Sequence, residues 1–387
     1  MAHLVDTLRP GGAEGVAVKY ANRLAKQGIE VHLVASRYGG SLEAFVAPRV
    51  RLFIAGRKSV FDIAGFARLL KYLKESGIQI VHSHNSSSAL LSRVLNCLLP
   101  RRAPCLVTHD HHGPANRQKW KMRLCFAGTK CHFVVSDTLG NWARDLYGVD
   151  TRKIRLLPNA VDLEEFPEKR NETLRAAYAI PKGSLVLACV ANFRPEKEHL
   201  LLAKALSRLP ERGRITTLLV GQKINPRHLQ AVEAAFSSCG HDYRILLDCS
   251  NVSEILRGSD IGILTSSVES GPVAVLEYMA AGLPFVAPDV GMCIDMLKGL
   301  GALHPLRPLA ESCGTIFPAS QLDGCLKGLS LLVKAAADER KNVGRRGRAL
   351  VAKHFAVESR VENIMVEYQN ILRRVSGDVQ PNKEKKR

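Results

Sequence analysis

The 387-residue sequence lacks the features that mark membrane-spanning proteins, secreted proteins and proteins held together by disulfides or zinc. No run of 18 apolar residues occurs, which argues against an ordinary membrane-spanning helix. The ten cysteines include no Cys-x-x-Cys pair, so we expect no disulfide or zinc framework and a reducing compartment. The first six residues lack the charged start and apolar core of a signal peptide. With 46% hydrophobic residues, the composition predicts a soluble cytoplasmic protein with packed cores.

Acidic residues are scarce relative to basic ones: 36 Asp and Glu face 55 Lys and Arg, giving a net charge of +19. Residues 1–165 hold 24 basic and 13 acidic residues, and the remainder holds 31 and 23. The positive electrostatic field of this charge excess favours an anionic partner, which can be a membrane surface, a phosphorylated acceptor or nucleic acid. Because the charge is spread over both halves and no recognisable nucleic-acid-binding motif is present, we expect no nucleic-acid partner.

Short apolar runs alternate with helical periodicity in two successive series. Strands are predicted over 2–7, 30–35, 78–83, 105–109, 132–136 and 154–159, and then over 185–190, 217–221, 244–247, 261–265 and 285–287. Two such series predict an α/β protein with two doubly wound, Rossmann-like domains facing a cleft. We place these domains at 1–165 and 166–350. A helix over 351–375 and a disordered tail over 376–387 complete the prediction.

The stretch around residue 270 is typical of a strand, a tight turn and a helix. A buried strand over 260–265 precedes the turn, Ser270 is a suitable N-cap, and Pro272 suits the first helical turn. Gly282 and Pro284 then end the helix. Free N–H groups at such a helix start point at the carboxyl edge of the sheet, where α/β folds bind phosphate.

Two carboxylates flank this turn, Glu269 before the helix and Glu277 inside it. Together they can hold the hydroxyls of a sugar and a ribose beside a phosphate bound by the backbone of Gly271–Val273. A Glu before a helix and another within it are common, so the spacing alone does not separate this interpretation from chance.

Two cations follow the first predicted strand of the second domain. Arg194 and Lys197 lie three residues apart at a strand-to-helix turn, where they can neutralise a diphosphate as charge develops on a leaving group. Two solvated surface charges are the alternative. A second phosphate or sugar contact is predicted at Gly11 and Gly12, which permit close backbone approach, although most double glycines are only turns.

Histidines gather at the ends of two predicted strands. The segment Thr108-His-Asp-His-His112 contains residue types that can bind a metal ion. No cysteine or spaced histidine motif supports a zinc site, so we expect no metal and no cofactor. His82 and His84 end the preceding strand, where an acceptor-lining role and a packing role are equally open.

The segment Arg117-Gln-Lys-Trp-Lys-Met-Arg-Leu-Cys-Phe126 interleaves four cations with apolar side chains. Such a segment suits an anionic lipid surface, where each cation contributes about 1 kcal/mol. A solvated helix with its apolar residues packed inward is the equal alternative. The segment therefore suggests that the protein attaches peripherally to the inner face of a membrane.

Several of these stretches together resemble the retaining GT-B glycosyltransferases of family 4, also called group 1. The run Glu269-Ser-Gly-Pro…Glu277-Tyr-Met-Ala-Ala-Gly-Leu-Pro is similar to the family's donor-binding signature. Gly11-Gly-Ala-Glu14 is similar to its N-terminal glycine element, and Leu157-Pro-Asn-Ala-Val-Asp-Leu-Glu-Glu-Phe166 to its interdomain hinge. The resemblance covers roughly residues 1–375 and implies a C-terminal helix that crosses back to the first domain.

The resemblance implies a role for each candidate residue. Donor-binding residues would be Gly11, Gly12, Arg194, Lys197, Glu269, Ser270, Gly271, Pro272, Val273 and Glu277. Within that set, Arg194 and Lys197 grip the diphosphate, Glu269 binds the sugar and Glu277 the ribose. His109 contacts the transferred sugar and can orient it or assist proton transfer. His109, Arg194, Lys197 and Glu269 form the predicted catalytic set.

The sequence departs from the family at three positions near Lys197. Asn192 stands where the family has its arginine, Ala191 where it has a glycine before it, and Glu198 where it has a glycine after the lysine. Arg194 can stand in for the missing arginine from two residues further on.

The expected activity is metal-independent transfer of a sugar from a nucleotide diphosphate to an acceptor hydroxyl. The acceptor expected is a lipid-linked or anionic glycan of the lipopolysaccharide type. A sugar-nucleotide epimerase of the same fold, an inactive GT-B scaffold and a nucleic-acid-binding protein are the alternatives.

Overall fold

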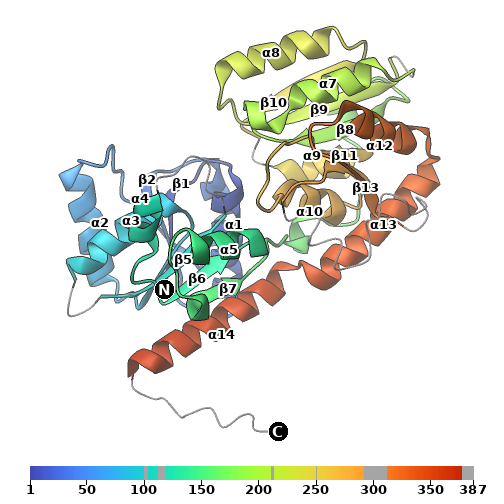
Figure 1. The fold of residues 1–387 in the computed structure, drawn as a ribbon. Coiled ribbons are helices and arrows are strands. Elements are labelled where there is room, and N and C mark those ends of the chain that lie inside the picture. Colours follow the sequence, from blue (N-terminus) through green and yellow to red (C-terminus); the bar gives the residue numbers. More distant parts are fainter. Residues whose placement is uncertain (100–102, 112–118, 211–212, 250, 292–311, 377–387) are drawn as a thin grey trace. The chain divides into compact units, whose positions relative to one another are not determined.

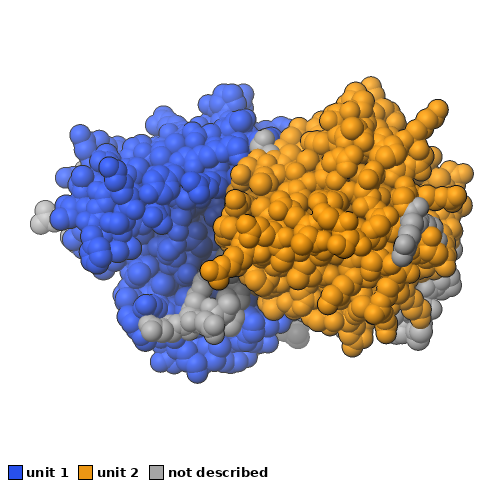
Figure 2. All heavy atoms as spheres, turned by 90° about the horizontal axis from the view of Figure 1, so that it is seen from above, with its two compact units in different colours: residues 1–157, 358–387 blue, residues 158–357 orange. Residues whose placement is uncertain are grey.

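A computed structural model describes all residues except 100–102, 112–118, 211–212, 250, 292–311 and 377–387. The chain forms two compact units, coloured separately in Figure 2. Unit 1 comprises Met1–Leu157 with Glu358–Arg387, and unit 2 comprises Pro158–Val357. The tail predicted over 376–387 lies, apart from Ser376, outside the described residues.

Unit 1 contains a parallel sheet of seven strands in the order β3-β2-β1-β4-β5-β6-β7 (Figure 1). The strands are β1 Ala2–Thr7, β2 His32–Tyr38, β3 Arg51–Ile54, β4 Ile80–Ser83, β5 Cys105–Asp110, β6 Cys131–Val134 and β7 Ile154–Leu156. The helices are α1 Gly12–Lys26, α2 Ile63–Glu75, α3 Ser86–Cys97, α4 Lys119–Phe126, α5 Asp137–Asp145 and α14 Val357–Ser376. The strand order reverses between β1 and β4, which is where doubly wound sheets place their ligands.

The last helix, α14, packs on unit 1 although it follows unit 2 in sequence (Figure 1). The Tyr368 hydroxyl lies 2.6 Å from Nδ1 of His82, and Glu367 accepts a hydrogen bond from Arg155 at 2.6 Å. Both contacts join the helix to strands of the seven-stranded sheet. Hydrophobic residues on α14 such as Val361 and Ile364 are fully buried, so the helix is part of the core of this unit.

Unit 2 contains a parallel sheet of six strands in the order β10-β9-β8-β11-β12-β13. The strands are β8 Leu185–Val190, β9 Ile215–Gly221, β10 Asp242–Leu247, β11 Ile261–Ile263, β12 Phe285–Pro288 and β13 Gly314–Phe317. The helices are α6 Leu174–Ala177, α7 His199–Ser207, α8 Pro226–Ser237, α9 Val252–Gly258, α10 Val273–Ala280, α12 Leu322–Lys334 and α13 Ala337–His354. Helix α7 packs against α8 and α12, whereas α10 packs against α9 and α13.

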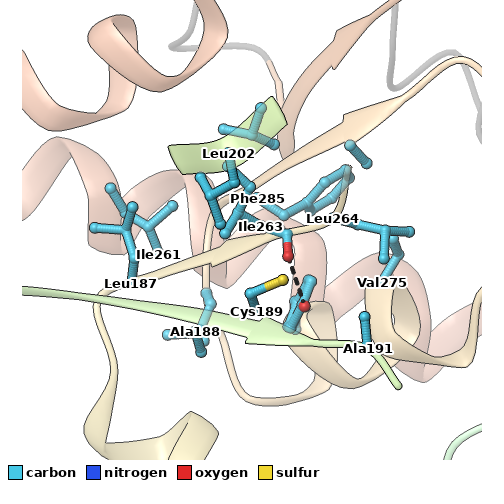
Figure 3. Close-up of a cluster of buried hydrophobic side chains, with 14 of the residues drawn as sticks. Leu187, Ala188, Cys189, Ala191, Leu202, Ile261, Ile263, Leu264, Val275 and Phe285 are labelled. Carbon is cyan, nitrogen blue, oxygen red and sulfur yellow. Dashed lines mark hydrogen bonds between the residues drawn. The ribbon is translucent and has the colours of Figure 1, made fainter. Parts of the chain in front are cut away.

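Apolar residues from both faces of the central strands form the core of unit 2 (Figure 3). Leu187 and Cys189 on β8, and Ile261 and Ile263 on β11, are fully buried. Strands buried on both faces read as continuous apolar runs, which is why the sequence pattern revealed them. Burial of this kind contributes about 25 cal/mol per Å² of apolar surface.

The predicted α/β class with two doubly wound sheets is confirmed. Strands β3 and β13 were not predicted. The single helix predicted over 351–375 is divided between the end of α13 and α14. They are separate because Val161 pairs with the intervening backbone: its N–H donates to Phe355 O at 2.9 Å, and its carbonyl accepts from Val357 N at 3.1 Å.

Candidate functional site

Of the two predicted carboxylates, Glu269 lies in the turn between β11 and α10, and Glu277 lies within α10. The helix begins at Val273, and Pro272, with φ −70° and ψ 100°, is its N-cap residue. The prediction that Ser270 caps the helix and that Pro272 lies in its first turn is therefore wrong. The Pro272 carbonyl accepts from Val275 N at 3.2 Å, so helical hydrogen bonding starts only after this extended residue. The predicted end is confirmed, with Ala281 as C-cap followed by Gly282 at φ +71°.

Lys197 and Glu269 form a close ion pair at the carboxyl ends of β8 and β11. Lys197 Nζ lies 2.5 Å from Glu269 Oε1, and both side chains are nearly buried, at 11% and 12% exposed. The Ser266 hydroxyl donates to the same oxygen at 2.7 Å. Among the described residues no hydrogen bond engages Oε2 of Glu269, which leaves one carboxylate oxygen able to accept from a sugar hydroxyl.

The loop that presents Lys197 is held against the loop that presents Glu269. The Thr265 hydroxyl donates to Lys197 O at 2.9 Å, and the backbone N–H of Ser267 donates to Glu196 O at 2.9 Å. A charged pair with little solvent exposure requires such support, because each charge is costly to bury without its partners.

Asn159 and Tyr278 support this arrangement from two other elements. Asn159 Nδ2 donates to Gly271 O at 2.7 Å, inside the turn that carries the predicted donor contacts. The buried Tyr278 hydroxyl donates to Ile263 O at 2.9 Å and accepts from Val190 N at 2.9 Å, which ties the ends of β11 and β8 together. Glu277, next to Tyr278 on α10, is half-buried.

Arg194 does not join the Lys197–Glu269 pair. Its guanidinium is 3.3 Å from Glu196, and its side chain is 40% exposed. The predicted stand-in for the family arginine is therefore engaged by its own neighbour in this structure.

Two of the three residues that depart from the family pattern make defined contacts in the structure. Asn192 Oδ1 accepts from Gln222 N at 2.9 Å and so fastens β8 to the end of β9. Glu198 has φ +46°, the left-handed conformation that a glycine at this position adopts without strain. Its carboxylate accepts a hydrogen bond from Ser320 at 2.7 Å.

Unit 1 carries the glycine turn at the carboxyl end of β1. Gly11 is the N-cap residue of α1, and a Cβ placed on it would lie 2.3 Å from Glu14 Oε2, whereas one on Gly12 would meet nothing within 4 Å. Burial raises the pKa of Glu14, opposed by its backbone hydrogen bond and reinforced by Asp6. Asp6 accepts hydrogen bonds from Ser36, at 3.1 Å, and from Ser87.

His109 lies on β5 in a cluster with four other histidines of unit 1. It is 1% exposed, and neither ring nitrogen has a hydrogen-bond partner among the described residues. Its ring stacks on that of Tyr20, with centroids 6.2 Å apart. Burial, and then the neighbouring His111, His82 and His84, hold the pKa of His109 well below its usual range, so the ring is neutral.

Helix α4 contains the described part of the basic, aromatic segment; residues 117 and 118 lie outside it. Met122 and Phe126 are buried in unit 1, whereas Trp120 is 61% exposed and Leu124 is 43% exposed. The interleaved apolar side chains therefore divide between the core and the surface. No helix in the described parts of the chain is long and apolar enough to cross a membrane.

The structure thus brings Lys197, Glu269 and the Gly271–Val273 turn together at one sheet edge of unit 2. It adds supporting residues that the sequence did not reveal, namely Ser266, Asn159 and Tyr278 in unit 2 and Asp6 in unit 1. Asn159 lies in the Pro-Asn turn recognised only as a hinge. Tyr278 lies in the quoted signature run, but nothing in the run indicates the role of its hydroxyl. Ser266 and Asp6 carried no signal, because serine and aspartate near strand ends are too common to single out.

Comparison with protein families gives two adjoining matches. A model described as Glycosyltransferase Family 4 matches residues 10–165, and one described as Glycosyl transferases group 1 matches residues 170–349. Together they include both the glycine turn of unit 1 and the Lys197–Glu269 pair of unit 2.

Known proteins are similar along most of the chain. UDP-Gal:alpha-D-GlcNAc-diphosphoundecaprenol alpha-1,3-galactosyltransferase of Escherichia coli is 24% identical over 377 residues, covering 91% of this chain and 92% of that protein. Putative glycosyltransferase EpsF of Bacillus subtilis (strain 168) is 24% identical over 335 residues, covering 80% and 85%.

Solved structures show the same architecture. HepE from Anabaena, in complex with UDP and glucose, superposes with a TM-score of 0.76 at 14% identity, covering 95% of this chain and 98% of that chain. WaaG, a glycosyltransferase involved in lipopolysaccharide biosynthesis, gives a TM-score of 0.70 at 18% identity, covering 94% and 98%. These likenesses establish the GT-B fold predicted from the sequence.

Proposed function

We propose that this chain, which belongs to the group 1 glycosyltransferases, moves a hexose from a nucleotide diphosphate to an acceptor hydroxyl with retention of configuration. Use of a nucleotide sugar accords with its relatives, and HepE is described in complex with UDP and glucose. The observation that carries the proposal is the nearly buried Lys197–Glu269 pair beside the α10 turn.

The donor would bind through unit 2. The first N–H groups of α10 have no acceptor within the helix, and the positive end of its dipole favours a phosphate there. The free Oε2 of Glu269 would accept from a hydroxyl of the sugar, and half-buried Glu277 would hold the ribose. Donor binding would thus use groups whose positions Ser266 and Asn159 already hold.

Departure of the diphosphate is the step that needs charge stabilisation. The bond between the sugar C1 and the diphosphate oxygen breaks, and the electron pair leaves with the diphosphate. The acceptor oxygen forms the new bond to C1, and the acceptor hydroxyl proton passes to the departing diphosphate oxygen. Lys197 would neutralise the charge that develops, an effect typically worth 10²–10³ in rate, roughly. Arg194 would assist by exchanging its contact with Glu196 for the diphosphate, which is possible because it is 40% exposed. With these cations in that role, we propose that catalysis needs no metal.

The acceptor would bind through unit 1, and the glycine turn at Gly11 and Gly12 would contribute to donor binding by admitting close approach of a phosphate. In this proposal His109 orients the transferred sugar as a neutral ring. The acceptor class proposed is a lipid-linked or anionic cell-surface glycan, because unit 1 is strongly basic and relatives include an enzyme acting on a diphosphoundecaprenol-linked sugar. Exposed Trp120 and Leu124 on α4, together with its lysines, would bring the enzyme to the cytoplasmic face of a membrane.

The test is a panel of UDP-, GDP- and ADP-sugars, measured for binding and for turnover. Wild type is compared with Lys197→Ala and Glu269→Ala, and with Lys204→Ala as the control, since Lys204 is an exposed lysine on α7. We expect one nucleotide to bind selectively, both site variants to be impaired and the control to be unchanged. Anomeric coupling constants of the product report retention. Absence of binding to every nucleotide sugar would reject the proposal.

A further inference from the structure

Five buried histidines meet inside unit 1, on three neighbouring strands: one near the start of β1 and two each at the carboxyl ends of β4 and β5. They are His3 on β1, His82 and His84 at the end of β4, and His109 and His111 at the end of β5, each at most 6% exposed. Residues two apart on a strand face the same side, so His82 with His84 and His109 with His111 project onto one face. One ring nitrogen of each member lies within 4.8 Å of the others in two groups, His3–His82–His84 and His84–His109–His111.

The distances between ring nitrogens show which of the two groups fits a metal site. Two imidazoles on one tetrahedral Zn²⁺, with bonds of about 2.0–2.1 Å, have their nitrogens about 3.3 Å apart. His84 Nδ1 and His111 Nε2 are 3.2 Å apart, a hydrogen-bond contact in this structure that also matches the spacing of two ligands on one ion. His3 Nδ1 and His84 Nε2 are 2.7 Å apart, which is too close for two ligands of one ion and suits a hydrogen bond.

His109 supplies an independent reason to expect a ligand. It is fully enclosed, yet neither of its ring nitrogens has a hydrogen-bond partner among the described residues. A buried polar atom without a partner is costly and rare in native structures, so such a group needs an explanation. A ring with no hydrogen bond can also turn toward an ion without breaking one.

We propose that His84, His109 and His111 bind a divalent transition-metal ion of the Zn²⁺ type. Neutral imidazoles are the ligands that such ions prefer, and three of them leave a fourth position for water. With Nδ1 of His84 on the metal, its Nε2 carries the proton and donates to His3 at 2.7 Å. That contact sets the tautomer and orientation of His84, as outer-shell partners of metal-bound histidines do. The site lies within unit 1 and shares His109 with the proposed contact to the transferred sugar, which would use the other ring nitrogen.

The test uses protein without a polyhistidine tag, stripped with EDTA and titrated with CoCl₂. Tetrahedral Co²⁺ gives intense visible absorption, and we expect one equivalent to bind and to be displaced by ZnCl₂. His109→Phe, which preserves a ring against Tyr20, and His111→Ala should abolish the signal. His3→Phe should weaken Zn²⁺ binding about 10–100-fold, as loss of an outer-shell partner does.

Two variants act as matched controls. His82→Phe removes a member of the other group, and His132→Phe removes a buried histidine one strand away that contacts Thr108 at 2.7 Å. Both should still bind one Co²⁺. Circular dichroism and thermal unfolding in EDTA identify any variant that fails to fold. Such a variant is replaced by one that carries Asn at the same histidine position.

Two outcomes would overturn the proposal. One is the absence of stoichiometric Co²⁺ binding to the wild type. The other is binding that survives His109→Phe and His111→Ala, which would place the ion at a different site. Donor binding in EDTA is measured separately, so failure of the metal site and failure of the proposed transferase function give different results.

Discussion

The side-chain amide of Asn159 donates to the carbonyl oxygen of Gly271 at 2.7 Å, across 112 residues of sequence. Asn159 is buried, and it belongs to the segment that opens unit 2. Gly271 lies in the turn before α10, beside the Lys197–Glu269 pair. The contact therefore links the first residues of this unit to the turn proposed to bind the donor.

Replacing Asn159 with Ala should impair both stability and donor binding. The variant leaves the Gly271 carbonyl without this donor, which costs about 1–3 kcal/mol, and it frees the turn to move. We expect a lower melting temperature and an increase of roughly tenfold in the donor Kd, which corresponds to about 1.4 kcal/mol. Isothermal titration with the selected nucleotide sugar measures the second effect.

Asn225→Ala provides the control for this experiment. Asn225 caps α8 by accepting from His228 N at 3.0 Å, in the same unit but on another element. Its loss should cost about 1 kcal/mol of stability and leave the donor Kd unchanged. If both variants altered binding equally, Asn159 would act through stability alone.

Lys197 and Glu269 should be strongly coupled in stability. Removing either partner leaves the other charge nearly buried and unpaired, which typically costs about 3–5 kcal/mol. We expect Lys197→Met and Glu269→Gln to destabilise unit 2 individually, and the double variant to be less unstable than the sum. Thermal unfolding of all four proteins completes the double-mutant cycle. Additive effects would show that the pair is not formed in solution.

Tyr278→Phe should destabilise unit 2 without removing apolar contact. The hydroxyl is buried, and its loss deprives both the Ile263 carbonyl and the Val190 N–H of a partner, at about 1–3 kcal/mol. Tyr178→Phe is the matched control, since its hydroxyl has no hydrogen bond among the described residues. An unchanged melting temperature for Tyr278→Phe would show that β8 and β11 are not held by this hydroxyl.

Glu198→Gly should stabilise the loop after Lys197. Glu198 has φ +46°, which costs a side-chain-bearing residue roughly 1–2 kcal/mol, whereas glycine adopts it freely. The hydrogen bond lost from Ser320 is exposed and worth less. We expect a higher melting temperature and unchanged turnover. Ser320→Ala measures the contribution of that hydrogen bond, and a lower melting temperature for Glu198→Gly would contradict the strain argument.

The sequence was sufficient for the fold and for part of the site, for identifiable reasons. Buried strands such as β8 read as apolar runs, and the pair Lys197 and Glu269 lies in stretches that match a known signature. Strand β3, by contrast, is largely exposed and shows no continuous apolar run. The engagement of Arg194 by Glu196 depends on rotamers that no pattern encodes. The histidine cluster forms because sheet order places β1, β4 and β5 side by side, and sequence spacing cannot show that.

His199 should make the stability of unit 2 depend on pH below neutrality. It is fully buried against Phe193, and burial, with smaller contributions from His228 and Lys197 opposed by a backbone contact to Ala191, lowers its pKa to about 4. The unfolded chain binds a proton near pH 6.5, whereas the folded chain does not until about pH 4. Stability from this group is therefore complete above pH 6.5 and declines as the pH falls toward 4, by up to about 3 kcal/mol.

The variant His199→Phe removes this titration and keeps an aromatic ring stacked against Phe193. We expect the melting temperature of wild type to fall more steeply than that of the variant between pH 6.5 and pH 4. Above pH 7 both proteins should be insensitive to pH at this position, because the histidine is neutral in the folded and unfolded states alike. Parallel slopes for the two proteins across the acidic range would show that His199 already takes up its proton in the folded enzyme.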